Sequence, residues 1–106
     1  MEPIYSQTGG CCIGRNAWLA INATWPFAGL CVYTDQLVLS TFLRRLRFQR
    51  KDISQIERYY GIFSSGLRIV HTVASYPRNV VFWTRDVAEL EQVLRANAFP
   101  VGTPTI

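Results

Sequence analysis

Apolar and polar residues alternate along most of this chain, in short segments that are separated by turn-forming residues. Such alternation is typical of β-strands that bury one face. It is clearest at residues 45–50, where Leu46 and Phe48 fall on one face and the residues between them are arginine or glutamine. The pattern predicts seven strands, at residues 16–22, 28–33, 37–42, 45–50, 56–60, 67–73 and 80–84.

The period of the pattern changes to that of an α-helix at residues 86–97. Asp86 and Glu89 have the spacing of a capping box and suit the positive end of the helix dipole, and Pro100 marks the end. The apolar stripe of this helix consists of Val87, Leu90, Val93 and Leu94. We therefore expect a mainly β barrel or sandwich of seven strands, with one end closed by the C-terminal helix.

The chain length of 106 residues fits one domain with one core. We expect a flexible N-terminal extension at residues 1–14, a folded domain at residues 15–97 and a C-terminal tail at residues 98–106. The first residues lack the basic start and the apolar run of a secretory signal. A cytoplasmic location is therefore expected, in keeping with the few cysteines.

One segment resembles a membrane span, because residues 16–34 carry no charge and approach the length needed to cross a bilayer. Asn22, Thr24 and Pro26 interrupt it, and residues 25–29 have the composition of a turn. We expect two strands joined by a turn here rather than a transmembrane helix.

The charge of the chain is biased toward arginine. Ten arginines and one lysine oppose seven acidic residues, which gives a net charge of +4. Arginine favours fixed, planar contacts to carboxylate or phosphate groups, so this bias indicates an anionic partner, although a solvated basic surface gives the same composition. The basic residues predicted to bind a ligand are Arg44, Arg45, Arg47, Arg50 and Lys51.

The alternative interpretation of this basic cluster is an edge strand, since charged side chains also keep such a strand soluble and unpaired.

Trp25 and Phe27 are candidate anchors for a membrane or a partner, because exposed aromatic rings beside a rigid proline bind well. The competing interpretation of these two rings is a turn that folds back on the barrel.

Candidate catalytic chemistry is sparse. Cys11, Cys12 and Cys31 are odd in number and lack metal-ligand spacing, so neither a disulfide framework nor a metal site is predicted. His71 shares a face with Leu67, and no nucleophile or ligand accompanies it, so we expect a hydrogen-bonded histidine in the core or at its boundary. The chain is therefore predicted not to be an enzyme and to carry no cofactor.

Several motifs resemble those of short bacterial pleckstrin-homology-like (PH-like) proteins. They are WPFAGL at residues 25–30, DxLxLS at 35–40, GLRIVHT at 66–72, YP at 76–77 and VFW at 81–83. The resemblance covers about residues 15 to 97 and implies two roughly orthogonal antiparallel sheets that form a barrel plugged by the helix. It implies binding of phosphoinositides, peptides or other proteins, or assembly into a scaffold, without choosing among them.

The function expected from these observations is a non-enzymatic module for protein interaction or self-assembly, with a homo-oligomer as one form. The alternative is a peripheral membrane or anionic-ligand module, which would use the basic cluster to bind phospholipid headgroups at the inner face of the membrane. The first turn, at residues 22–28, carries no basic residue, unlike the best-known phosphoinositide-binding PH domains. Single-stranded nucleic acid is a weaker candidate, since Phe48 points away from its neighbouring arginines.

Overall fold

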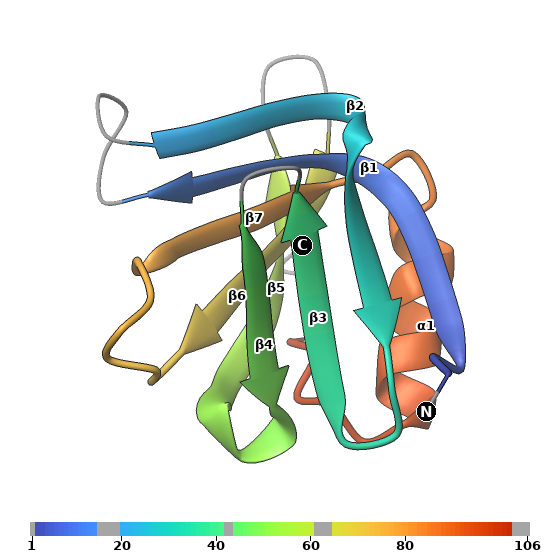
Figure 1. Ribbon diagram of the computed structural model, residues 1–106. Helices are drawn as coiled ribbons and strands as arrows, with labels where there is room; N and C mark the ends of the chain where they lie inside the picture. Colours follow the sequence, from blue (N-terminus) through green and yellow to red (C-terminus); the bar gives the residue numbers. More distant parts are fainter. Residues whose placement is uncertain (1, 15–19, 42–43, 61–64, 103–106) are drawn as a thin grey trace.

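The computed structural model describes residues 2–14, 20–41, 44–60 and 65–102, and in residues 20–25 only the backbone. Within these ranges the chain forms seven antiparallel strands and one C-terminal helix, which confirms the mainly β prediction (Figure 1). A short 3-10 turn, Arg50–Asp52, links β4 to β5. The elements are β1 (Tyr5–Gly14), β2 (Ala20–Val32), β3 (Gln36–Thr41), β4 (Arg45–Gln49), β5 (Ile53–Tyr60), β6 (Ser65–His71), β7 (Asn79–Trp83) and α1 (Val87–Ala96).

The strands form one continuous sheet in the order β4-β3-β2-β1-β7-β6-β5. The central strand, β1, pairs with β2 along its whole length but with β7 only from Gly10 to Gly14. A bulge lies between Gly9 and Cys11, and β1 and β2 curve strongly in this part of the sheet (Figure 1). The sheet is not closed, because β4 and β5 remain its two edges.

Gly9 lies at the point where β1 begins to run beside β7. A Cβ atom at this position would overlap the carbonyl oxygen of Trp83 and would lie 2.8 Å from the ring of Phe82. Only glycine leaves room for this close approach of two backbones. The glycine that borders the bulge therefore also permits the close approach of β1 to β7.

The core lies between the two halves of the bent sheet and the helix. The predicted alternation in β4 is confirmed, since Leu46 and Phe48 are fully buried and the three residues around them are exposed. Each half of the sheet contributes one large aromatic ring, Phe48 from β4 and Phe82 from β7. Burial of such side chains supplies most of the free energy that favours the folded state.

The helix is confirmed, and its apolar stripe packs on the core as predicted. Leu90 and Leu94 are fully buried, and Val87 and Val93 are partly buried against the same cluster. The predicted capping box is wrong: Asp86 makes no side-chain capping hydrogen bond. Glu89 instead accepts a hydrogen bond from the Tyr5 hydroxyl, with 2.9 Å between the oxygens.

The helix bridges the place where β1 has separated from β7. On one side, the Gln7 side-chain amide donates to the carbonyl of Asp86 at 3.0 Å. On the other, Arg58 of β5 forms an ion pair with Glu91, whose side chain is 3% exposed. The hydrogen bond to Glu91 raises the pKa of Arg58, so the guanidinium stays charged. The pKa of Tyr5 is also raised. Burial of its hydroxyl is the largest cause, and the Glu89 carboxylate contributes less.

Two predictions about the N-terminal third of the chain are wrong. The segment expected to be a flexible lead forms β1, and Gly9 within it serves close backbone approach rather than flexibility. The turn expected at residues 25–29 lies inside β2, where residues 24–27 bulge out opposite Gly10. Residues 16–19 of the expected first strand lie outside the described residues.

The start of the expected tail, from residue 98, also takes part in the fold. Phe99 is buried, and Val101 forms an isolated parallel bridge with Ile56 of β5. The Ile56 amide donates to Pro100, and the Gly102 amide donates to Ile56, both at 2.8 Å. In the part of the chain that the structure describes, no helix is long and apolar enough to cross a membrane.

The Arg58–Glu91 pair predicts an asymmetric response to substitution. Arg58→Met should lower the free energy of unfolding by about 3 kcal/mol, because it leaves the Glu91 carboxylate buried without its partner. The double substitution Arg58→Met with Glu91→Leu should recover most of that loss, since it removes both charges. Urea denaturation measures these differences, with Arg45→Met on the exposed face as a control. Equal losses in the single and double variants would contradict this account.

Candidate functional site

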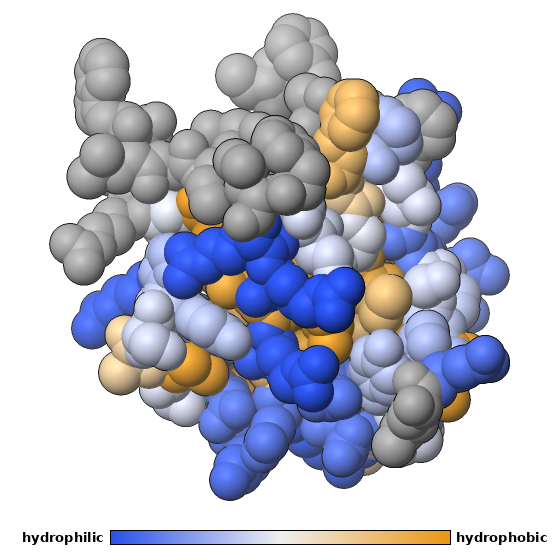
Figure 2. Space-filling view, viewed as in Figure 1, coloured by the Kyte–Doolittle hydropathy of each residue, from blue (hydrophilic) through white to orange (hydrophobic). Residues whose placement is uncertain are grey.

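The predicted basic cluster separates into two parts in the structure. Arg45 and Arg47 are exposed on β4, on the face of the sheet that points away from the core, and Arg44 precedes them. Hydrophilic side chains gather over the part of the sheet where Figure 1 shows β3 and β4 (Figure 2). These three arginines therefore form a basic surface along one edge of the sheet.

Arg50 is not part of that surface. Its guanidinium donates to the carbonyls of Thr34 and Asn97, the latter at 3.0 Å, and it lies 5.2 Å from the centre of the Phe99 ring. These contacts fasten the C-terminal end of the helix to the turn after β4. Lys51 is exposed, but it lines the same shallow hollow as Asp35 and Arg50. Arg45 and Arg47 are not among the residues that line this hollow.

Tyr76 joins the loop between β6 and β7 to the edge of β4. The backbone amide of Arg47 donates to the Tyr76 hydroxyl at 3.2 Å, and the Tyr76 ring packs edge-on against Phe48 with 5.4 Å between ring centres. The Arg44 guanidinium lies 5.8 Å from the centre of the same ring, within reach of a cation–π interaction. Another outward amide of β4, that of Gln49, donates to the Asp52 carboxylate at 3.1 Å. The β4 edge is therefore already occupied at two positions.

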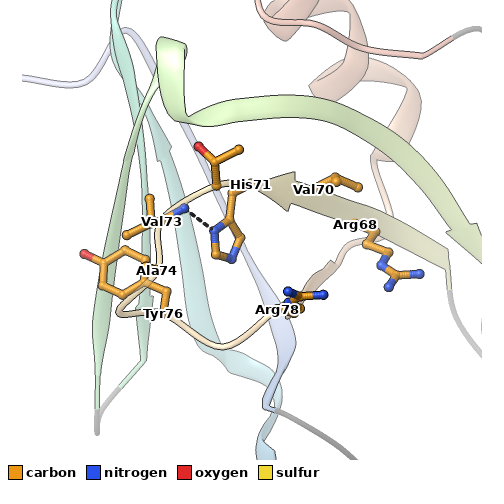
Figure 3. A pocket seen from close by; sticks show the side chains of 8 residues that line it. Arg68, Val70, His71, Val73, Ala74, Tyr76 and Arg78 are labelled. Carbon is orange, nitrogen blue, oxygen red and sulfur yellow. Dashed lines mark hydrogen bonds between the residues drawn. The ribbon is translucent and has the colours of Figure 1, made fainter.

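A groove of about 570 Å³ lies between β6 and the following loop. Its charged groups are Arg68 and Arg78, and the two side chains lie on the same side of the His71 ring in this view (Figure 3). The remaining lining residues are Val70, His71, Thr72, Val73, Ala74 and Tyr76. The sequence analysis did not identify this site, because its two arginines lie ten residues apart in different elements and no local pattern joins them.

His71 holds the loop in place. Its Nδ1 atom accepts a hydrogen bond from the Val73 amide at 3.1 Å, and its Nε2 atom donates to the Pro77 carbonyl at 2.8 Å. The ring also packs on Phe48, with 4.9 Å between centres. This agrees with the expected hydrogen-bonded boundary histidine. Because both nitrogens are bonded to the backbone, neither is placed to exchange a proton with a substrate.

The two candidate anchors differ in what the structure describes. Phe27 is 60% exposed on the bulged part of β2. The backbone of Trp25 belongs to the same strand, and its side chain lies outside the described residues. The ring of Phe27 is therefore accessible, as an apolar anchor must be.

The edge of β5 is a second feature that the sequence analysis did not identify. Ile56 turns its amide and carbonyl outward, toward residues 100–102. In an antiparallel strand every second residue turns the same way, so Arg58 and Tyr60 also face the edge. Within the described ranges no backbone group pairs with these two positions. Tyr59 and Tyr60 are 40% and 69% exposed, so this end of the edge is both unpaired and aromatic.

The cysteines are in the thiol form, with Cys11 buried and Cys12 and Cys31 partly buried. Among the described residues, no cluster of three or more histidine, cysteine or acidic side chains could hold a metal ion. The site candidates are therefore the basic surface, the groove and the β5 edge.

Comparison with known proteins adds no family to this picture. No family model matches the chain, and no curated protein matches it significantly. The PH-like resemblance therefore rests on the sequence motifs.

Proposed function

We propose that this protein is a non-enzymatic interaction module of PH-like fold, and that it binds an extended segment of a partner protein as an additional strand beside β5. The observation that carries the proposal is the unpaired, tyrosine-rich end of the β5 edge at residues 58–60. Strand addition of this kind gains affinity from backbone hydrogen bonds and specificity from alternate side chains.

The PH-like part of the proposal is supported by the order of the elements. The first four strands are consecutive neighbours, β1 is shared with the last three, and the helix follows β7. The bulge in β1 lies where this strand begins to pair with β7, and a bend of the sheet at this point is a feature that a barrel or a pair of orthogonal sheets would need.

The chain itself supports the choice of β5 over β4. At Ile56 the β5 edge already accepts an extended segment, residues 100–102, through two backbone hydrogen bonds. The β4 edge, by contrast, is covered at Arg47 by Tyr76 and at Gln49 by Asp52. A partner strand placed beyond residue 102 along β5 would meet the outward amide and carbonyl groups of Arg58 and Tyr60, which pair with no backbone group within the described ranges.

The partner is expected to contribute apolar or aromatic side chains. Tyr59 packs edge-on against Trp83, with 5.5 Å between ring centres, and so offers a fixed aromatic surface beside the edge. Ordered tyrosines gain contact area at a low cost in conformational entropy. A second copy of this chain is the self-assembly form of the same proposal, with two β5 edges paired.

A backbone-specific substitution tests the β5 edge. Tyr60→Pro should remove the outward amide without breaking a hydrogen bond to β6, because edge strands accept proline where the amide faces solvent. Peptides selected from a displayed random library on the native protein should lose at least tenfold in affinity for this variant. When bound to the native protein, the same peptides should perturb the NMR signals of residues 58–60.

The matched control is Tyr60→Thr, which keeps the amide and a strand-forming side chain but removes the ring. The loss should be smaller for Tyr60→Thr than for Tyr60→Pro. Peptides that bind Tyr60→Pro as tightly as the native protein would contradict strand addition. Light scattering over a range of concentrations separates pairing of two copies from binding of a separate partner.

The basic surface favours a second candidate function, binding to an anionic membrane. Ala28 pairs with Thr41, whose amide donates to the carbonyl of Arg44 at 2.7 Å. The exposed Phe27 ring therefore lies at the same end of the sheet as the start of the basic surface formed by Arg44, Arg45 and Arg47. Apolar anchors beside basic residues are the combination that binds anionic bilayers.

Vesicle sedimentation tests this second candidate. Native protein should bind vesicles that contain phosphatidylserine at physiological salt, and Arg45→Glu with Arg47→Glu should reduce the bound fraction severalfold, because each reversal replaces attraction by repulsion. Lys51→Glu, which changes an exposed charge elsewhere, should have a smaller effect. Equal binding to neutral vesicles, or no effect of the double reversal, would contradict it.

A further inference from the structure

We propose that the groove between β6 and the loop of residues 72–78 binds a phosphate monoester, and that Arg68 and Arg78 hold its charged group. This site is separate from the β5 edge and from the arginines of β4. The groove combines two arginines with an apolar wall (Figure 3).

The charge of the groove selects an anion. Two of its eight lining residues are arginines, and none is acidic. Glu57 lies 3.9 Å from Arg68 and neutralises part of its charge, whereas Arg78 is exposed. A guanidinium group binds phosphate oxygens through two parallel hydrogen bonds. A phosphate monoester has three terminal oxygens and up to two negative charges to share between two arginines, whereas a carboxylate has two oxygens and one charge.

Arg68 is held in position before any ligand arrives. Its guanidinium donates to the side-chain carbonyl of Asn79 at 3.2 Å, and Glu57 faces another of its nitrogens. An arginine fixed in this way loses less side-chain freedom on binding.

The size of the groove indicates that the phosphate carries an organic group. A volume of about 570 Å³ lies within the range of small-molecule sites and exceeds what one phosphate fills. Val70, Val73, Ala74 and the ring of Tyr76 line the remaining space. These apolar surfaces suit the carbon skeleton of an ester.

The walls of the groove are already formed. The two hydrogen bonds of His71 and the bond from the Tyr76 amide to the Val73 carbonyl, at 3.2 Å, fix the loop on the end of β6. The contact of Tyr76 with Arg47 fixes its outer side. A ligand therefore meets a preformed surface, which favours affinity.

An NMR titration with phenyl phosphate tests the proposal. The compound should shift the signals of residues 68–78, and benzoate, which has the same ring but a carboxylate, should bind at least tenfold more weakly. Arg78→Gln should weaken phenyl phosphate binding about tenfold or more, as expected for a lost charge-assisted hydrogen bond. Lys51→Gln is the matched control and should leave binding unchanged.

Three results would overturn the site: no shifts at millimolar phenyl phosphate, equal weakening by Lys51→Gln and Arg78→Gln, or no weakening by Arg78→Gln. Arg78→Lys keeps the charge but not the planar geometry, so it should give an intermediate affinity. Tyr60→Pro should bind phenyl phosphate as the native chain does, which separates this site from the β5 edge.

Binding to vesicles distinguishes a lipid headgroup from a soluble phosphate monoester as the ligand. If the ligand is a lipid headgroup, protein should prefer vesicles with phosphatidic acid, a monoester, over those with phosphatidylglycerol, and Arg78→Gln should abolish the preference. If the ligand is a soluble metabolite, phenyl phosphate should bind while no such preference exists. Absence of both responses overturns the proposal.

Discussion

The close crossing of β1 and β7 at Gly9 is the constraint on which the rest of this structure depends. β1 is the only strand described here that pairs with both halves of the sheet, and it can do so because Gly9 leaves room for the backbone of Trp83. The bend at this point turns the two halves toward each other, and Phe48 and Phe82 fill the space between them. The separation of β1 from β7 leaves an opening, which α1 covers through contacts to Tyr5, Gln7 and Arg58.

An open sheet leaves two edges, and the chain treats them differently. The β4 edge is covered by Tyr76 and Asp52 and flanked by exposed arginines, which are means by which proteins prevent unwanted strand pairing. Among the residues that the structure describes, the β5 edge is covered near Ile56 alone, by residues that follow the helix. Substitutions that alter a binding surface on the remaining part of β5 need no change in the core, because Tyr59 and Tyr60 lie outside it.

The parts of the fold that the sequence predicted are those governed by local periodicity. The alternation in β4 and the apolar stripe of α1 identify buried residues because each element buries one face. β1 was missed because its glycines matter only for a contact with β7, some seventy residues away. Residues 25–29 have the composition of a turn, and they belong to β2 because the pairing with β1 resumes at Ala28 and Gly29, which also pair with β3.

The candidate sites show the same limit. Sequence proximity grouped Arg50 with Arg45 and Arg47, yet its contacts to Thr34, Asn97 and Phe99 give it a structural role. Arg68 and Arg78 line the same groove only because the chain turns back after β6 through the loop that His71 holds. A lone histidine in a strand predicted a boundary position correctly, but its bonded partners could not be inferred from spacing.

The most direct test of the central claim is the stability of Gly9→Ala compared with Gly29→Ala, measured by equilibrium denaturation. A methyl group at Gly29 would lie 3.7 Å from its nearest neighbour, the Gln7 carbonyl oxygen, so that variant should keep its free energy of unfolding within about 1 kcal/mol. A methyl group at Gly9 would force β1 and β7 apart, and the free energy should fall by about 3 kcal/mol or more. Equal stability of the two variants would contradict the account.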